Sequence, residues 1–402
     1  MIPLEAEPDA IFAHLFGDAP SAIWLDSARE AYGSGRWSIM GAPDEVLTGI
    51  GWSDLAERMA RQDVETELPF AGGWVCTISD EGEITAARLS SFLLLDHEHG
   101  LIHERGCATA AALAAVPPLP EAAPPIETGR AEASVTRERY LDDLTTIRRW
   151  LLDGDSYEAC YTYQLRFDMA EPGFEAYRRL RRSNPAPFGA YLRLDGREVL
   201  SCSPERFLRV EKDGWAEAKP IKGTAPSSSD PALLAADPKA RAENLMIADL
   251  LRNDLGRICR PGTVEVPVFC GVETYATVHQ LVTTVRGRLC DGVDAVGAAE
   301  ALFPPGSMTG APKIRTVRLL ADLEGAPRGL YSGAIGYFSD DGTADLSVVI
   351  RTAIIEDGRV SIGTGGAITI DSDPESELAE TITKSAAMLA AFGRTHPLAT
   401  AE

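Results

Sequence analysis

The chain lacks the features that mark several large classes of protein. No apolar stretch approaches the length of a transmembrane helix, and the N-terminus has neither the basic region nor the apolar run of a signal peptide. Basic residues are in the minority, because 38 lysines and arginines face 60 acidic residues and give a formal charge of −22. Nucleic acid and anionic membranes would be repelled by this charge, so we expect a cytoplasmic protein with neither as a partner.

Cysteine and histidine are also scarce. The seven cysteines are an odd number, widely spread and without a CxxC pair, so we expect reduced, buried thiols. Of six histidines, only His97, His99 and His103 are grouped. They lie in an acidic strand-and-turn stretch, a pattern that disfavours a transition-metal site.

What remains is the composition of an ordinary globular chain of 402 residues, 45% hydrophobic and 24% charged. An Ala/Pro-rich stretch over 108–134 predicts a surface linker. It separates an N-terminal α+β region, 1–107, from a longer region over 135–395, in which the motifs described below lie.

Beyond the linker, Thr136 is expected to cap a helix that stops at Gly154, with apolar residues at helical spacing: Tyr140, Leu144, Ile147 and Leu151. Strands are predicted around 161–167, 190–194 and 207–210. Helices and strands do not alternate regularly, and no repeat is present. This disfavours Rossmann and barrel folds and favours a large antiparallel α+β fold.

The most informative segment is Lys219-Pro-Ile-Lys-Gly-Thr224, which follows a strand-like stretch. Taken alone, Lys222 is more typical of a solvated turn lysine than of a nucleophile. Five further motifs accompany it: Ser203-Pro-Glu-Arg-Phe207, Arg241-Ala-Glu-Asn-Leu-Met-Ile, Leu251-Arg-Asn-Asp-Leu-Gly-Arg257, Ser307-Met-Thr-Gly-Ala-Pro-Lys313 and Asp371-Ser-Asp-Pro-Glu-Ser-Glu.

Together these motifs resemble the chorismate-binding enzymes, the family of anthranilate, isochorismate and aminodeoxychorismate synthases. The resemblance covers 154–391 strongly and the N-terminal region weakly, where Ile23–Ser27 and Gly35–Gly41 look like the first strands. It implies two sheets packed as a β-sandwich with helices outside, an active site in a deep cleft, and Mg²⁺ as cofactor. In some relatives tryptophan is bound in the N-terminal sheet, in the region that matches Ser27.

Three glutamates are the expected magnesium ligands. Glu243 shares a helical face with Met246, Ile247 and Leu250, and a carboxylate on an apolar stripe needs a partner. Glu377 and Glu380 share a face of the last helix, although Glu380 can equally form a solvated i, i+4 pair with Lys384. The resemblance implies that Glu243, Glu377 and Glu380 surround the metal, a hard cation that prefers oxygen ligands.

The substrate implied by the family is a dicarboxylate, which needs positive and backbone donors. Gly363-Thr-Gly-Gly366 lets amides approach an anion, or forms a turn between strands. The resemblance assigns Arg351 and Tyr331 to the enolpyruvyl carboxylate, and His279 to the ring substituent, where a hydrogen-bonded core histidine is the alternative. The remaining matches that line the pocket are Thr224, Thr309, Gly365, Gly366 and Lys384.

The resemblance also implies a mechanism. Lys222 adds at C2 of chorismate as the C4 hydroxyl leaves, and ammonia then adds at C4 as the lysine departs. Glu205 acts as general acid and base. The Lys222 amine must be partly neutral, so we expect its pocket to lower its pKa. Anthranilate synthases usually carry alanine at this position, and the water-activating branches use a lysine in the motif that here reads Gly154-Asp-Ser-Tyr-Glu-Ala-Cys-Tyr-Thr162.

The source of ammonia lies outside this sequence. No cysteine occupies the Gly-x-Cys-x-Gly turn of glutamine amidotransferases, so we expect free ammonia or a separate glutaminase partner. Pro226-Ser227 departs from the Pro-Arg that often follows the lysine motif, which bears on the order of that loop.

The alternatives are an anthranilate or aminodeoxyisochorismate synthase, and an inactive paralogue that binds an aromatic ligand or a glutaminase as a regulator.

Overall fold

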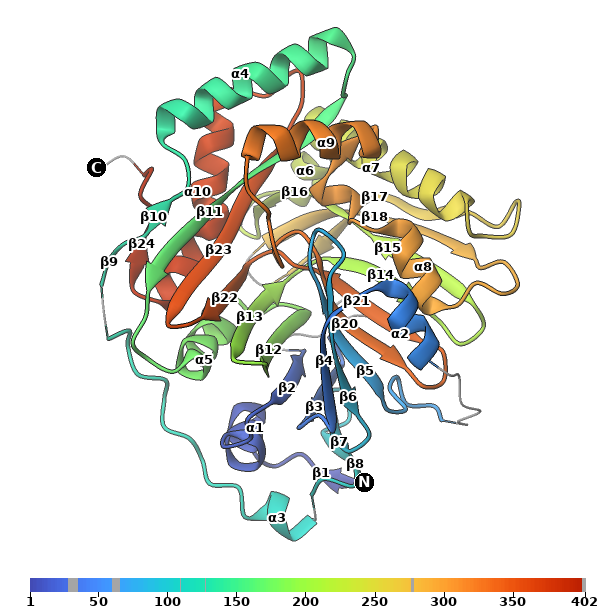
Figure 1. Cartoon of the computed structure of the whole chain (residues 1–402), viewed down its shortest axis with the longest axis vertical. Coiled ribbons are helices and arrows are strands. Elements are labelled where there is room, and N and C mark those ends of the chain that lie inside the picture. The colour runs from blue at the N-terminus through green and yellow to red at the C-terminus, as the bar shows by residue number, and fades with distance from the viewer. Residues whose placement is uncertain (28–34, 60–65, 109, 127, 276–277, 400–402) are drawn as a thin grey trace.

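Two large antiparallel sheets form the centre of the molecule (Figure 1). The computed structural model describes residues 1–27, 35–59, 66–108, 110–126, 128–275 and 278–399. The first sheet runs, in spatial order, through β1 (Ile2–Pro3), β8 (Leu101–Arg105), β7 (Phe92–Asp96), β3 (Trp37–Gly41), β2 (Ala22–Asp26), β12 (Phe188–Leu194), β13 (Arg197–Ser203), β22 (Thr352–Glu356), β23 (Arg359–Ile368), β11 (Glu158–Asp168) and β10 (Glu132–Ala133), with β19 (Gly310–Ala311) also on β11.

The second sheet runs through β16 (Ile221–Pro226), β18 (Val278–Arg288), β15 (Trp215–Lys219), β14 (Arg206–Val210), β21 (Ala344–Val348), β20 (Ala334–Ser339), β5 (Gly73–Ile78), β6 (Ile84–Leu89) and β4 (Glu45–Ile50), with β17 (Glu265–Thr274) also on β18. A small parallel pair joins β9 (Gly129–Arg130) to β24 (Arg394–Thr395). The faces of the two large sheets pack on each other through apolar side chains of both, among them Ile23, Leu94, Leu192, Val75 and Ile335.

Helices cover the outer faces of this sandwich. Those whose buried residues join the core of the first sheet are α1 (Pro8–Phe16), α4 (Arg137–Asp153), α5 (Gly173–Ser183), α9 (Lys313–Glu324) and α10 (Pro374–Ala391). Those on the second sheet are α2 (Trp52–Arg58), α6 (Pro231–Ala236), α7 (Pro238–Gly256) and α8 (Ala295–Leu302). The short elements α3 (Ala110–Ala114) and η1 (Gly306–Met308) lie in connections. The antiparallel sandwich with external helices confirms the fold expected from the sequence.

The sequence signals for α4 are met in detail. The Thr136 side chain accepts a hydrogen bond from the backbone amide of Arg139, and Gly154 ends the helix in the left-handed conformation with φ of 79°. Both features satisfy backbone groups that a helix end leaves unpaired. The predicted strands at 161–167, 190–194 and 207–210 correspond to β11, β12 and β14.

The N-terminal strands belong to the same sheets as the rest of the chain. Strand β2 pairs with β12, and β5 pairs with β20, so residues on both sides of 108–134 build each sheet. That stretch carries α3 and the short strands β9 and β10, the last of which lies at the edge of the first sheet. The division of the chain at 107 and 135 stays a prediction.

Two neighbouring crossings carry the chain from one sheet to the other. Strand β13 of the first sheet leads through Ser203–Arg206 into β14 of the second, and β21 returns to β22 through residues 349–351. The Ser203 hydroxyl donates to the carbonyl of Val348 at 2.6 Å, and the Val348 amide donates to the carbonyl of Glu205 at 3.0 Å. Glu205 and Arg351 are therefore held at the junction of the two sheets, and not within either sheet.

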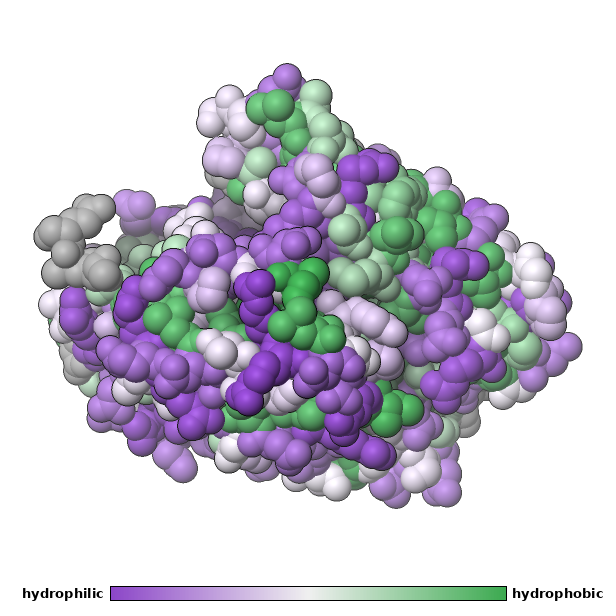
Figure 2. All heavy atoms as spheres, turned by 90° about the horizontal axis from the view of Figure 1, so that it is seen from above, coloured by the Kyte–Doolittle hydropathy of each residue, from purple (hydrophilic) through white to green (hydrophobic). Residues whose placement is uncertain are grey.

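Bulk properties agree with the sequence reading. All seven cysteines are free thiols, five of them buried. Among the described residues, none of the helices combines the length and the apolarity that crossing a bilayer demands. The face in Figure 2 is largely hydrophilic with separate apolar patches; exposed large apolar side chains include Leu233 on α6, Leu245 on α7 and Ile314 on α9.

Candidate active site

Lys222 lies on strand β16 and not in a solvated loop. Its side chain is buried, and its Nζ lies 2.8 Å from Glu158 Oε1 on β11 of the other sheet. The register of β16 against β18 shifts between Ile221 and Thr224, a bulge that re-aims the lysine. Gly223 follows with φ of 94°, and a Cβ there would lie 2.8 Å from Ala240 of α7, so helix packing demands glycine. The loop alternative is therefore wrong.

The pKa of Lys222 is raised, which corrects the expectation of a lowered one. Burial is the largest single influence and disfavours the ammonium, as expected, but the charge and hydrogen bond of Glu158 and the charge of Cys160 together outweigh it. Glu243 adds to this effect. In this structure Lys222 is therefore a protonated, ion-paired side chain, and it becomes a nucleophile only by giving up a proton.

Glu158 is a site residue that the sequence reading missed. It is 1% exposed, and its Oε2 has no hydrogen-bond partner among the described residues. A buried carboxylate oxygen without a donor is costly unless a ligand or a cation completes it. The sequence signal for Glu158 is its place in the Gly154–Thr162 motif.

Glu205 has the properties of a proton donor near neutral pH. It is 6% exposed at the junction of the sheets, and burial raises the pKa of its carboxyl to about 7, against the smaller opposing effects of the Ser307 hydroxyl, Lys222 and Lys384. A carboxyl with this pKa is half protonated at pH 7, the condition under which general acid catalysis is most effective.

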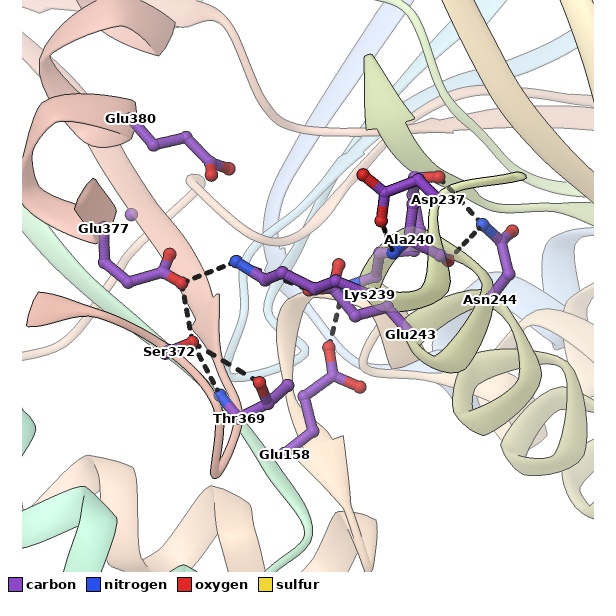
Figure 3. Close-up of polar contacts among 12 residues, drawn as sticks. Glu158, Asp237, Lys239, Ala240, Glu243, Asn244, Thr369, Ser372, Glu377 and Glu380 are labelled. Carbon is purple, nitrogen blue, oxygen red and sulfur yellow. Dashed lines mark hydrogen bonds and ion pairs between the residues drawn. The ribbon is translucent and has the colours of Figure 1, made fainter. Parts of the chain in front are cut away.

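The three predicted metal ligands come together from two helices. Glu243 projects from α7, and Glu377 and Glu380 project from α10, around the Nζ of Lys239 (Figure 3). That nitrogen lies 2.8 Å from Glu377 Oε1 and 3.9 Å from Glu243 Oε1. Ser372 also donates to Glu377 Oε1 at 2.6 Å. Glu380 forms the predicted i, i+4 pair with Lys384 at 2.6 Å.

The chemistry of this donor set fits a hard divalent cation. Burial raises the pKa of Glu243, and the carboxylates of Glu158 and Glu380 raise it further, against the lowering effect of Lys222 and Lys239. Glutamate oxygens are the ligands that Mg²⁺ prefers, and its charge would favour the ionised form of Glu243. The oxygens of Glu243, Glu377 and Glu380 do not all lie within 4.8 Å of one another; among the described residues that spacing is met by Asp96, Glu98 and His99.

That second group already has a cation. Arg36 forms ion pairs with Asp96 at 2.7 Å and with Glu98 at 2.8 Å, and His99 pairs with Asp96 at 2.9 Å. The guanidinium offsets one of the two carboxylate charges of this surface cluster. That no transition metal binds near His97, His99 and His103 stays a prediction.

Arg351 has no anionic partner among the described residues. It has a left-handed backbone with φ of 49°, and burial lowers its pKa. Within the described part of the chain its side chain forms no ion pair or hydrogen bond. A strained, largely enclosed arginine that lacks a counter-ion is typical of a site that binds a carboxylate.

The glycine-rich segment is part of a strand, so the alternative of a turn is wrong. Residues 363–366 pair with β11 inside β23. A Cβ at Gly363 would lie 2.1 Å from the ring of buried Tyr331, which explains why glycine is needed there. Lys384 Nζ donates to the carbonyl of Gly365 at 3.3 Å, on the side away from β11. In an antiparallel strand the amide and the carbonyl of one residue point to the same side, so the Gly365 amide also faces away from β11. A Cβ at Gly366 would lie 3.5 Å from Glu377 Oε2.

The remaining predicted residues differ in exposure. His279, on β18, is buried, with Nδ1 2.9 Å from the Thr274 hydroxyl and Nε2 3.1 Å from the carbonyl of Ser229. These contacts tie the 226–229 turn to β18 and satisfy both ring nitrogens, as a core histidine would be satisfied. Thr224 is exposed on β16, whereas Thr309 is buried and donates to the carbonyl of Gly306 at 3.0 Å.

Asp249 and Asp254, in and near the Leu251–Arg257 motif, form ion pairs away from the proposed site. Asp254 is buried and accepts from Lys313 Nζ at 2.5 Å, which fixes the start of α9 against α7. Asp249 pairs with Arg252 on the surface of α7. Neither contacts Lys222 or the metal-site glutamates in the described structure.

A buried arginine fastens the Thr309 loop to β11. Arg328 pairs with Glu324 at 2.7 Å and donates to the carbonyls of Met308 at 2.7 Å and Cys160 at 2.8 Å. We expect Arg328→Met to lower the free energy of unfolding by about 3 kcal/mol, because it leaves Glu324 buried without its partner. Urea unfolding measures this change; an Arg328→Met, Glu324→Leu double variant should recover most of the loss, and no recovery would contradict the account.

Ser27 lies elsewhere. It borders a cavity of about 400 Å³ between the sheets, lined also by Trp37, Gly189 and Tyr337, and its hydroxyl donates to the carbonyl of Trp37 at 2.5 Å. Lys222, Glu205 and Arg351 do not line this cavity. Residues 28–34, beside it in the sequence, lie outside the described part of the chain. Binding of tryptophan there stays a prediction.

Comparison with known proteins places these residues in a family. Residues 63–390 match the family model described as chorismate binding enzyme. An aminodeoxychorismate synthase of Streptomyces pristinaespiralis is 41% identical over 98% of this chain and 65% of its own length, and one of Streptomyces griseus is 38% identical over 96% and 63%. The chain thus spans less than two thirds of these curated relatives.

Solved structures agree on the fold. Anthranilate synthase component I from Streptococcus pneumoniae superposes with a TM-score of 0.78 at 26% identity, over 90% of this chain and 93% of that one. The menaquinone-specific isochorismate synthase of Escherichia coli superposes with the same score at 20% identity, over 97% and 92%. With the family model covering most of its length, the chain belongs to the chorismate binding enzyme family.

Proposed function

We propose that this chain is aminodeoxychorismate synthase component I, which aminates chorismate at C4 with ammonia to give 4-amino-4-deoxychorismate for 4-aminobenzoate and folate, or for an arylamine pathway. The observation that carries the proposal is the buried pair of Lys222 and Glu158, with a carboxyl of pKa about 7 at Glu205. A nucleophile, a proton acceptor and a proton donor are the groups that the two-step amination needs.

The chemistry follows from the protonation states of these groups. Lys222 transfers a proton to Glu158 and its amine forms a bond to C2, while both ring double bonds shift and the C4 hydroxyl leaves as water with the proton of Glu205. Ammonia then forms a bond to C4, both double bonds shift back and the C2–nitrogen bond of Lys222 breaks. The released amine regains its proton from Glu158, the new C4 ammonium returns a proton to Glu205, and the pyruvyl group is kept.

Mg²⁺ held by Glu243, Glu377 and Glu380 would supply the positive charge that binds the ring carboxylate. Ser372 orients Glu377, since its hydroxyl donates to the carboxylate that would serve as ligand. The Gly365 amide and Lys384 add donors at the same end of the site. The second carboxylate, on the enolpyruvyl group, is proposed to bind Arg351, with Tyr331 beside it.

Arg351 gives the first test of this assignment. We expect Arg351→Gln to raise the KM for chorismate by about 30-fold with a smaller change in kcat, because a charged partner of the substrate is lost in the ground state as well as the transition state. Initial rates at saturating Mg²⁺ and ammonium measure both constants. Arg209→Gln, at an exposed surface pair with Glu211, is the control. An unchanged KM would contradict the role given to Arg351.

Ammonia is proposed to come from a separate glutamine amidotransferase or from free solution. A relative from Salmonella typhimurium is named aminodeoxychorismate synthase component 1, and the name supports the existence of a partner component. Glutamine should therefore be inactive as nitrogen source with this chain alone and become active when a glutaminase subunit is added. His279, Thr224 and Thr309 remain proposed pocket residues.

An anthranilate synthase is the second candidate, because anthranilate synthase component 1 of Geobacillus stearothermophilus is 39% identical over 65% of this chain. A lysine is not needed when ammonia itself attacks at C2, so a buried Lys222 favours amination at C4. An inactive regulatory paralogue is disfavoured, since a binding module does not need the nucleophile and its paired carboxylate.

A further inference from the structure

Lys239 stands where the proposed metal would be held. Its Nζ lies 2.8 Å from Glu377 Oε1 and 3.9 Å from Glu243 Oε1, and it interacts electrostatically with Glu380. Figure 3 shows the side chain extended from α7 toward α10, between the carboxylates that we propose as ligands. One ammonium group therefore contacts both helices that would bind Mg²⁺.

Contacts within its own helix stabilise the lysine little, because its i, i+4 pair with Glu243 is long, at 3.9 Å. It is the second residue of α7, where the aligned peptide dipoles disfavour a cation, and Asp237 already caps the helix by accepting from the Ala240 amide at 3.0 Å. The ammonium is stabilised chiefly by its ion pair with Glu377, whose side chain is only 2% exposed. Without a cation this carboxylate would be buried with the Ser372 hydroxyl as its one neutral donor among the described residues.

The lysine is also free to leave. Its side chain is 46% exposed, whereas that of Lys222 is 9% exposed and is enclosed between the sheets. A long, flexible, half-exposed stem can move its ammonium into water at small cost. Glu377 and Glu243 are more enclosed and stay in position for the next cation.

We propose that Lys239 is a built-in counter-ion that occupies the magnesium position of the empty enzyme and is displaced when Mg²⁺ binds. This inference rests on the proposed function for the metal site only, and not on the lysine mechanism. Binding is then an exchange of an ammonium for a divalent ion. Between turnovers the ammonium balances part of the negative charge of the carboxylates. The net affinity for Mg²⁺ is weaker by the free energy of the Lys239 ion pairs, which must be broken when the metal binds.

The test measures Mg²⁺ itself, without chorismate. By isothermal titration calorimetry we expect Lys239→Met to bind Mg²⁺ about tenfold more tightly than the wild type, because no bound cation must be displaced. Thermal unfolding should show a lower Tm for the metal-free variant and a larger increase on adding Mg²⁺. Lys239→Arg, which keeps the charge, should bind Mg²⁺ with nearly the wild-type Kd. Arg252→Met removes a cation from the same helix, far from the site, and should leave both measurements unchanged.

A second readout follows the amine. Acetylation of Lys239 in the wild type, quantified by mass spectrometry, should become several-fold faster in saturating Mg²⁺, because the displaced amine is in water. A faster reaction together with tighter binding by Lys239→Met supports the inference. If the wild type binds Mg²⁺ while Lys239→Met binds no more tightly and the acetylation rate does not change, the inference fails and the metal site stands. If neither protein binds Mg²⁺, the proposed metal site fails as well.

Discussion

Replacement of Lys222 by alanine is expected to lower the rate of aminodeoxychorismate formation by a factor on the order of 10³ or more, because the covalent step loses its nucleophile. The KM for chorismate should change little, since Arg351 and the metal site bind the two carboxylates. Steady-state rates with ammonium and Mg²⁺ separate the two constants. The loss should also remain at saturating chorismate, because it does not arise from weaker binding.

A neighbouring lysine provides the control. Lys219 lies in the same motif, before Pro220, and pairs with Glu273 at 2.7 Å. Because its partner differs from that of Lys222, Lys219→Met should keep kcat within a few-fold of the wild type. Lys222→Arg should remain as inactive as the alanine variant, since a guanidinium keeps the charge beside Glu158 but is not deprotonated. Substantial activity in either Lys222 variant would mean that the amine does not attack C2.

The second large effect is expected at Glu205. Glu205→Gln should lower kcat by a factor on the order of 10² to 10⁴, because the leaving hydroxyl loses its proton donor. The sign of the pH dependence follows from the raised pKa. In the wild type the carboxyl is protonated below about pH 7, so kcat should fall as pH rises through about 7.

The fall of kcat with rising pH is measurable only when the concentration of unprotonated ammonia is constant. Rates between pH 5.5 and 9 should be compared at a fixed concentration of unprotonated ammonia, since that fraction itself rises with pH. The descending limb near pH 7 should be absent in Glu205→Gln, and Glu211→Gln, at an exposed surface pair with Arg209, should keep it. If the limb persists without the Glu205 carboxyl, then another group is the acid.

The motifs predicted the fold and named most residues of the proposed site, because these residues are held by local structure as well as by tertiary contacts. Thr136 and Gly154 set the ends of α4 through capping, and the glutamates of α7 and α10 follow helical spacing. Lys222 was harder to place, since Pro220 and Gly223 resemble a turn. In the structure they produce a bulge in β16 that packs against α7.

Contacts between distant segments were beyond the sequence. The pairing of Lys222 with Glu158 joins residues 64 apart. With the charges of Cys160 and Glu243 it reverses the expected direction of the lysine pKa, because together these contributions outweigh desolvation. Lys239 and Arg328 were likewise missed. A lysine at a helix start and an arginine before Gly329 have no distinctive local pattern, and their roles depend on Glu377 and Glu324.

The central claim is amination at C4 through Lys222, and the identity of the product tests it most directly. Purified chain would be incubated with chorismate, Mg²⁺ and ammonium, beside Lys222→Ala, and the products identified by mass spectrometry, with a lyase added to convert aminodeoxychorismate to 4-aminobenzoate. The account predicts 4-aminobenzoate from the wild type and nearly none from the variant. Anthranilate or isochorismate from the wild type, or no product at high ammonium, would contradict it.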